Sequence, residues 1–182
     1  MKATGIVRRI DDLGRIVIPK EIRRTLHIRE GDPLEIYTDR QGEVILKKYS
    51  PIGELGKFAQ EYAESIFQTA KYIVCICDRD NIIAISGLPK KNLLNKKIGP
   101  QIEKVIENRR TVIGEKSTGS EYTLLVDEDE ELFVCVISPI VAQGDPIGAL
   151  ILLSEDSSIK ITDNEVKIAE IGSSFLGKQM EQ

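Results

Sequence analysis

Five arginine side chains near the N-terminus have the chemistry to bind phosphate: Arg8, Arg9, Arg15, Arg23 and Arg24. A guanidinium group is planar, binds phosphate oxygens in a bidentate geometry and does not lose its charge. A basic series also recurs at i, i+3, i+4 and i+7, made up of Lys20, Arg23, Arg24 and His27, which predicts a continuous basic stripe on one helix. By itself the pattern fits either a solvated helix surface or a surface that faces the phosphates of a nucleic acid.

The distribution of charge favours the phosphate-facing interpretation. Residues 1–24 contain seven Lys or Arg and three acids, a net charge of +4, whereas the whole chain carries −4. Residues 1–50 carry +3 and the other 132 residues carry −7. A basic end on an acidic body indicates two functions on one chain. Since the first 50 residues are only slightly positive, they must concentrate their charge on one face to attract a polyanion.

The stretch from Arg8 to Leu26 must position the arginines. We expect a short apolar strand that ends near Ile10, a turn over residues 11–14 that contains Asp and Gly, and a second, buried strand over 16–18. A helix should begin at Pro19, because proline fits the first helical turn. Strands at 34–37 and 43–48 should follow, preceded by turns at 29–33 and 39–42.

These elements are too few to form a stable core alone. A segment of about 50 residues with four short strands and one helix buries little apolar surface. Dimerisation is the natural remedy, and the exchange of hairpins between two chains is a low-cost way to achieve it. A dimer would also double the number of arginines around one two-fold axis.

Several segments within residues 1–51 resemble the swapped-hairpin DNA-binding domain of the AbrB family of transition-state regulators: GIVRR, DDLGRIVIPKEIRRTL, GDPLEIY and ILKKYSP. In that family two chains exchange hairpins into one dimeric, β-barrel-like unit, and arginines on the loop and helix contact DNA. The resemblance implies double-stranded DNA as a partner and assigns the contacts to Arg8, Arg15, Arg23 and Arg24, with His27 outside the set. Over its whole length the chain resembles sporulation regulators of endospore-forming bacteria.

Residues 51–70 are predicted to form a connecting helix. Ser50 suits an N-cap and Pro51 a first helical position. A heptad-like series then follows, at Ile52, Leu55, Ala59, Tyr62, Ile66 and Thr69. It fits either a helix packed on its own domain or one that also packs against its counterpart in another subunit. Gly53 and Gly56 weaken the first turns.

Residues 71–182 alternate strands and helices. We expect a hairpin of strands 72–77 and 82–86, a helix at 98–109, and strands at 121–126, 132–142 and 147–153. The two long apolar strands among them should form the centre of an antiparallel sheet. A last helix should follow the capping box that runs from Thr162 to Glu165.

This order of elements is that of a GAF-type sensory domain, and SPIVAQGDPIGALILLS at Ser138–Ser154 resembles the paired strands of that family. The implied fold class is α+β: an N-terminal swapped-hairpin, β-barrel-like dimer, and a C-terminal GAF-like antiparallel sheet with helices. The Asn, Lys, Asp and Glu set of the cyclic-nucleotide-binding members is absent from the sequence. The resemblance therefore leaves open an unknown small-molecule ligand, or a role in assembly only.

Other reactive side chains carry weaker signals. Cys75 and Cys77 lie two apart on one strand, and with Cys135 they make an odd number, which favours free core thiols over a zinc site. We expect no metal and no cofactor. Lysines 90, 91, 96 and 97 form a basic patch that is more often solvated than bound to DNA or an anionic ligand. The acidic run at 127–131 lacks the Gly and distal Glu of a calcium loop and should be an exposed hairpin tip.

The predicted domains are a DNA-binding domain at 1–50, a connecting helix at 51–70 and a GAF-like sensory or assembly domain at 71–182. Dimers should assemble into a tetramer through the last of these. No catalytic motif is found, so we do not expect an enzyme. With no apolar run near the roughly 20 residues of a membrane helix, we expect no membrane partner and a cytoplasmic, nucleoid-associated location. The alternatives are a swapped-hairpin antitoxin and a small-molecule sensor whose N-terminal half only dimerises.

Overall fold

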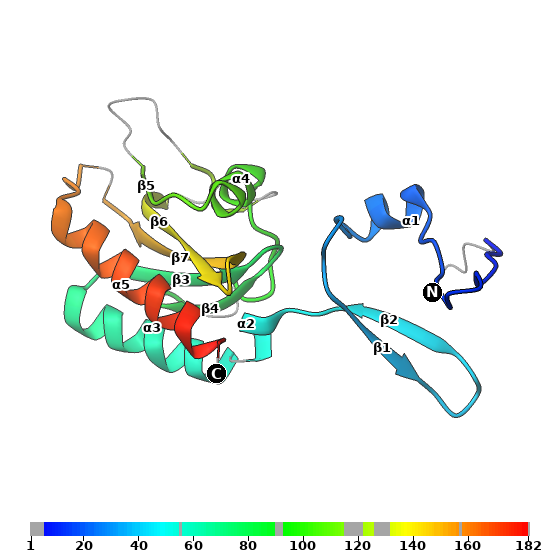
Figure 1. Ribbon diagram of the computed structural model, residues 1–182. Helices are drawn as coiled ribbons and strands as arrows, with labels where there is room; N and C mark the ends of the chain where they lie inside the picture. Colours follow the sequence, from blue (N-terminus) through cyan, green and yellow to red (C-terminus); the bar gives the residue numbers. More distant parts are fainter. Residues whose placement is uncertain are drawn as a thin grey trace. The chain divides into compact units, whose positions relative to one another are not determined.

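The computed structural model describes residues 6–54, 56–89, 93–114, 122–125, 132–156 and 158–181 (Figure 1). The chain divides into two compact units, Met1–Tyr49 and Ser50–Gln182. No helix in the described ranges is long and apolar enough to cross a membrane.

The first unit contains one short helix and one hairpin. Helix α1 spans Lys20–Thr25, and strands β1 (Leu34–Thr38) and β2 (Val44–Lys48) pair antiparallel. Both strands and the helix confirm the sequence predictions. The loop from residue 39 to 43 reverses the chain with Gly42 at φ 84°, a conformation that glycine adopts without steric cost.

The two strands predicted on either side of the first turn are not formed. Residues 6–10 and 15–18 have no strand structure, and Val7, Ile10 and Val17 are 90%, 65% and 73% exposed. The prediction of a buried strand over 16–18 is therefore wrong for the single chain. A strand needs a neighbour to satisfy its backbone donors and acceptors, and no strand among the described residues pairs with these two segments.

The first unit has almost nothing buried. Among its described residues, 6–49, only Pro19 falls in the buried class. Its large apolar side chains are exposed instead, among them Ile36, Val44 and Leu46 on the hairpin. Because contiguous exposed apolar surface marks an interaction site, this unit requires a partner surface to complete its core.

The second unit is built on a five-stranded antiparallel sheet in the order β4-β3-β7-β6-β5. The strands are β3 (Ile73–Asp78), β4 (Ile82–Ser86), β5 (Val112–Ile113), β6 (Phe133–Ala142) and β7 (Asp145–Ser154). The central strand is β7, which pairs with β3 on one side and β6 on the other. This confirms the prediction that the two long apolar strands form the centre.

One predicted strand is misplaced. Of the expected strand 121–126, the described residues 122–125 show only an isolated bridge, between Leu125 and Ile98. Leu124 and Leu125 are buried in the core cluster that includes helix α4, so side-chain burial explains this apolar run without a ladder. The edge strand on this side of the sheet is the two-residue β5, which pairs with β6.

Helices cover both faces of the sheet. Helices α3 (Gly56–Ala70) and α5 (Asp163–Gln179) pack on one face, and α4 (Pro100–Asn108) packs on the other (Figure 1). The alternation along β3 separates the two cores, because Val74 and Ile76 face α3 and α5 whereas Cys75 and Cys77 face α4. The prediction that these two cysteines share one face of a strand is confirmed. All three cysteines are buried and none forms a disulfide with another described residue. Burial raises the pKa of the Cys135 thiol to about 11.

The connecting segment belongs to the second unit. Helix α2 (Pro51–Glu54) precedes α3, and the Ser50 hydroxyl caps it by accepting from Gly53 N at 3.1 Å. Ile52 of α2 and Ala59 and Ala63 of α3 are buried against the sheet, so both helices pack on their own unit. Its predicted seam residue Leu55 lies outside the described residues.

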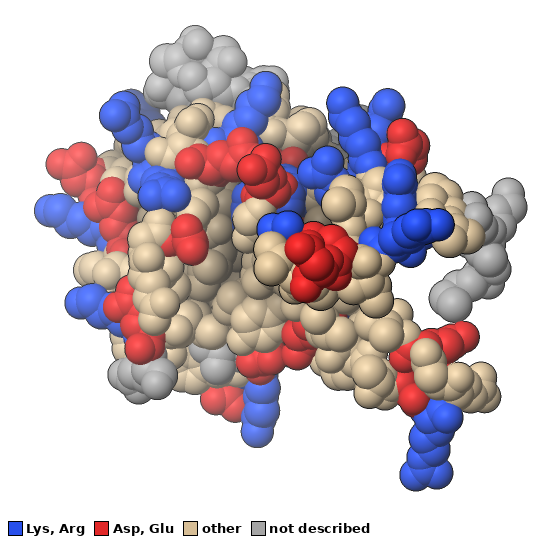
Figure 2. Space-filling model, turned by 45° about the vertical axis from the view of Figure 1, so that its right-hand side comes forward, with Lys and Arg blue, Asp and Glu red and all other residues tan. Residues whose placement is uncertain are grey.

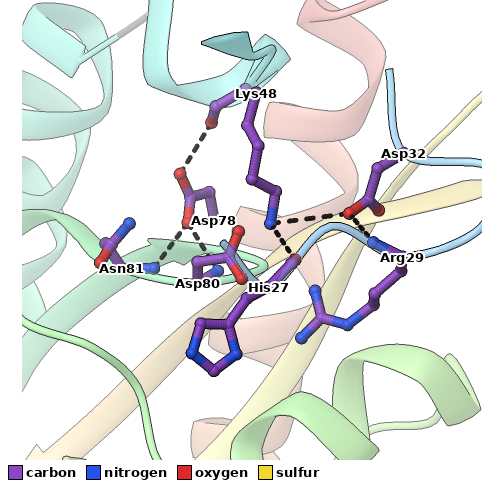
Figure 3. Close-up of polar contacts among 8 residues, drawn as sticks. His27, Arg29, Asp32, Lys48, Asp78, Asp80 and Asn81 are labelled. Carbon is purple, nitrogen blue, oxygen red and sulfur yellow. Dashed lines mark hydrogen bonds and ion pairs between the residues drawn. The ribbon is translucent and has the colours of Figure 1, made fainter. Parts of the chain in front are cut away.

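Two sets of hydrogen bonds hold loops of this unit in place. In the turn between β3 and β4, Asp78 accepts from the backbone N–H groups of Asp80 and Asn81 at 2.8 and 2.7 Å, and the Ser50 hydroxyl donates to its other oxygen at 2.9 Å (Figure 3). The predicted capping box is present at the start of α5, with the Thr162 N–H donating to Glu165 at 2.8 Å.

Two charged clusters noted in the sequence fall largely outside the described residues. These are Lys90 and Lys91 of the lysine patch, and the acidic run 127–131. Of the remaining lysines, Lys96 is half-buried and Lys97 is exposed. The described residues contain no group of three or more His, Cys, Asp or Glu that could hold a metal ion.

We predict that Gln60→Ala lowers the stability of the second unit by about 1–3 kcal/mol, because a buried donor and acceptor lose their partners. The Gln60 amide donates to the Ile85 carbonyl at 2.9 Å and accepts from the Ile85 N–H at 3.2 Å, which satisfies both groups on the outer side of edge strand β4. Urea denaturation of the full chain measures the loss. Gln68→Ala, an exposed change on the same helix, is the control; equal midpoints for the two variants would contradict the assignment.

Candidate nucleic-acid interface

Asp11 organises the loop that carries the first two arginines. One of its carboxylate oxygens accepts from the backbone N–H groups of Leu13 at 3.0 Å and Arg15 at 2.7 Å. The other accepts from Arg15 Nε at 2.8 Å. Gly14 closes the turn at φ 76°, donating to the Asp11 carbonyl at 3.0 Å. The predicted turn is thus confirmed, with a bond to the Arg15 side chain that the sequence pattern did not reveal.

The bond to Asp11 leaves Arg15 accessible. Its side chain is 69% exposed, and a guanidinium group has five N–H donors, of which this bond uses one. Arg8 is exposed as well and forms no ion pair among the residues described. Hydrogen bonds from the backbone and side chain of Arg15 lower the pKa of Asp11 from its usual 3.8.

Helix α1 carries the other two arginines. Arg24 is exposed, whereas Arg23 is half-buried. The Nε of Arg23 is buried, and no hydrogen-bond partner for it lies in the described part of the chain. A buried donor without a partner is unfavourable. No internal ion pair neutralises either arginine within the described ranges.

The predicted basic stripe is shorter than expected. Helix α1 ends at Thr25, and His27 lies beyond it in the left-handed region, at φ 53°. The extension of the stripe to His27 is therefore wrong, and only Lys20, Arg23 and Arg24 belong to the helix. The apolar side is also incomplete, since Ile22 is half-buried and Leu26 is 55% exposed.

A polar clamp holds the loop after α1 against the end of β2. Lys48 Nζ donates to the His27 carbonyl at 2.7 Å and lies 3.6 Å from the Asp32 carboxylate (Figure 3). Asp32 also accepts from the Arg29 N–H at 2.7 Å, and its side chain is only 4% exposed. Because the clamp ties the C-terminal end of α1 to the hairpin, it fixes where Arg23 and Arg24 stand. The sequence pattern contains no signal for this contact between distant residues.

The surface of the first unit is predominantly basic where these elements lie. Figure 2 shows Lys and Arg side chains crowded together at the upper right, over this unit, whereas acidic and basic side chains alternate over the left of the view. The predicted site residues Arg8, Arg15, Arg23 and Arg24 all belong to this one unit. Their contact with DNA stays a prediction.

We predict that Arg15→Ala raises the pKa of Asp11 towards its usual 3.8 without fully restoring it, because the backbone hydrogen bonds persist. A lowered folded pKa means that the Asp11 contacts stabilise the loop above pH 3.8 and are lost as the pH falls through the folded value. NMR of the Asp11 carboxyl carbon against pH measures the shift. Arg9→Ala in the same loop should leave it unchanged, and an unaltered titration in Arg15→Ala would refute the pairing.

Two protein families match different parts of the chain. Residues 54–181 match the C-terminal domain of stage V sporulation protein T, described as a transcription factor. Residues 7–54 match the family of MazE, an antidote-toxin recognition protein and bacterial antitoxin.

Two curated relatives come from Bacillus subtilis (strain 168). Stage V sporulation protein T is 54% identical over 182 residues, which is 100% of both chains. The transition state regulatory protein AbrB is 65% identical over 51 residues, 28% of this chain and 52% of the relative.

Solved structures support the fold of the second unit. The GAF domain of an Acinetobacter phosphoenolpyruvate-protein phosphotransferase is 13% identical, with a TM-score of 0.54 over 71% of this chain and 87% of that one. Part of a methyl-accepting chemotaxis protein is 19% identical, with a TM-score of 0.55 over 70% and 93%. Both likenesses concern the fold alone, and they confirm the GAF-like, α+β assignment. With a relative that is half identical from end to end, the chain belongs to the stage V sporulation protein T family.

Proposed function

We propose that this protein is a DNA-binding transcriptional regulator of sporulation genes. Two copies of residues 1–50 form a swapped-hairpin dimer that contacts double-stranded DNA through Arg8, Arg15, Arg23 and Arg24. The observation that carries the proposal is a combination of two features in one small unit. Of its four candidate arginines only Arg15 has an ion-pair partner among the described residues, and almost no apolar surface of the unit is buried. The first feature attracts a polyanion and the second requires a second chain.

The exposed apolar residues around the first turn support hairpin exchange. Ile6, Val7, Ile16 and Val17 flank the turn that Asp11 closes, and all are exposed. With a second chain alongside, residues 6–10 and 15–18 gain hydrogen-bonding neighbours and become strands. This change would bury the apolar side chains and leave the arginine-bearing turn at the surface.

The electrostatic part of the proposal has a quantitative consequence. A dimer presents the four candidate arginines twice, eight in all. If binding releases about eight counterions, the affinity for DNA falls by roughly 10³ to 10⁵ as the salt concentration rises from 50 to 200 mM. Acids within the unit reduce its net charge, but Asp11 and Asp32 are engaged in fixing loops. These two carboxylates still reduce the positive charge that the unit presents to DNA.

We predict that Arg24→Ala weakens binding to a labelled promoter fragment and reduces the slope of log K against log salt by about one unit for each arginine removed, two per dimer. Arg40→Ala is the matched control, since this exposed arginine lies in the turn of the β1–β2 hairpin and changes the charge equally. Equal losses in the two variants would refute the assigned face. Analytical ultracentrifugation should find both in the same assembly state as the parent, and Arg23→Ala combined with Arg24→Ala should weaken binding further.

The second unit is proposed to join dimers into a tetramer and to bind an unknown small molecule. An apolar ridge on its surface suits the first role. Ile171 and Phe175 on α5 are 67% and 39% exposed, and the Phe175 ring stacks on Tyr62 of α3 with centroids 5.2 Å apart. A ridge formed by two helices of one chain can pack against the same ridge of another.

We predict that Ile171→Asp converts the tetramer into a dimer, because a carboxylate cannot be buried unpaired at a helix interface. Light scattering coupled to gel filtration measures the mass. Asn164→Asp adds the same charge at an exposed position of α5 and should leave the mass unchanged. A tetramer that survives Ile171→Asp would place the interface elsewhere.

Two rival functions make different predictions. An antitoxin, which the match of residues 7–54 to the MazE family favours, would bind a toxin through its C-terminal part, whereas here that part folds into a five-stranded sheet. A sensor with a purely dimerising first unit would not lose affinity for DNA in Arg24→Ala. The proposal includes no catalytic step and locates the protein on the nucleoid, where its DNA partner is.

A further inference from the structure

A polar cleft of about 360 Å³ lies on one flank of the second unit. Strand β6 and helix α5 form its walls, and the segment after α4 closes one end. Its volume lies at the lower limit of sites for small molecules. It is on the α5 face of the sheet.

A chain of three hydroxyl groups forms the floor of this cleft. Thr111 and Ser138 have their hydroxyl oxygens 3.2 Å apart, and those of Ser138 and Ser173 are 2.7 Å apart. Ser138 and Ser173 are only 2% and 4% exposed. Ser138 is the one polar side chain in the otherwise apolar strand β6, and it lines the cleft.

The direction of this chain sets what it offers to a ligand. Ser173 donates to the Glu170 carbonyl at 3.2 Å, and a hydroxyl has only one proton. Ser138 therefore donates to Ser173, and Thr111 donates to Ser138. This arrangement leaves the half-buried Thr111 hydroxyl as an acceptor at the open end. If a ligand anion instead accepts a hydrogen bond from the Thr111 hydroxyl, the hydrogen bonds between the three hydroxyl groups can reverse their direction. The floor of the cleft can therefore either accept from a ligand or donate to it.

Two cations and two acids surround the hydroxyls. Arg109 and Lys178 line the cleft together with Glu170 and Glu181. Of these four side chains, only Glu181 has a hydrogen bond in the described residues, from the Gln143 N–H at 2.7 Å. Arg109 ends α4 in the left-handed region, at φ 55°, a position where glycine is usual. Arg109 therefore has a backbone conformation that is strained for a residue with a side chain, and it lines the cleft.

We propose that this cleft binds an L-α-amino acid. The lining has two positive and two negative groups, so it has no net charge and does not favour a simple anion. A zwitterion satisfies both signs: its carboxylate pairs with Arg109 and Lys178, and its ammonium group with Glu170 and the Thr111 hydroxyl. Pro139 and Val141 supply a short apolar wall for the side chain. This inference rests on the proposed function, and it gives the unknown ligand a binding site and a chemical class.

The test uses the full-length protein without DNA, so that failure to bind DNA and failure to bind a ligand are measured separately. Each of the twenty L-amino acids is titrated singly by isothermal calorimetry and by thermal denaturation. We expect at least one to bind and to raise the unfolding midpoint. Arg109→Ala and Lys178→Ala should each weaken that binding by about tenfold or more, the loss expected for a charge-assisted hydrogen bond.

Matched controls are available beside both cations. Arg110→Ala alters the next residue, which is exposed and outside the cleft, and Lys167→Ala alters an exposed lysine on the same helix. Both should bind the amino acid as the parent does. Binding by none of the twenty amino acids overturns the proposal, and so does an equal loss in variants and controls.

The zwitterion assignment has its own test. The α-hydroxy acid that corresponds to the bound amino acid lacks the ammonium group and should bind at least about tenfold more weakly to the parent protein. In Glu170→Gln this difference should shrink. A hydroxy acid that binds as tightly as the amino acid, with Glu170→Gln unaffected, shows that the cleft takes a carboxylate and overturns the amino-acid class.

Discussion

The first unit cannot bury its own apolar side chains, and most features of this protein follow from that shortage. A segment with one buried residue among those described gains too little from the hydrophobic effect to offset the entropy of ordering its backbone. Its predicted strands at 6–10 and 15–18 stay unpaired for the same reason. Association with a second copy provides the missing neighbours, and it also doubles the number of arginines on one body. Stability and affinity for a polyanion therefore have a common origin.

Within this unit the acidic side chains act as organisers. Asp11 ties the loop of Arg15 together, and Asp32 and Lys48 join the loop after α1 to the hairpin. Each carboxylate lowers the net charge that the duplex experiences, but each restricts the orientation of an arginine-bearing segment. Positioning of a few guanidinium groups matters more for recognition than a larger, disordered positive charge.

The second unit has the opposite character, since its sheet is covered on both faces. Helix α5 approaches β6 closely because Gly177 has no side chain; a Cβ atom there would collide with the Val141 carbonyl. This close approach brings Ser173 within hydrogen-bonding distance of Ser138. The same helix thus contributes Ile171 and Phe175 to an apolar ridge, and Glu170, Ser173 and Lys178 to a polar cleft.

The sequence by itself determined the local elements and the types of side chain available. Turn residues, capping residues and alternation of apolar positions depend on neighbours in the chain, so the β1–β2 hairpin, the cap of α5 and the central strands could be predicted. The shortage of core in the first unit and its basic character were also visible from composition, and the family resemblance singled out four of its arginines. Only the tertiary structure decided that Leu124 and Leu125 are buried without forming a strand ladder, that α1 ends before His27, that Lys48 contacts Asp32, and that the hydroxyl groups of Thr111, Ser138 and Ser173 meet. These outcomes depend on contacts between residues far apart in the chain, and no local pattern encodes such contacts.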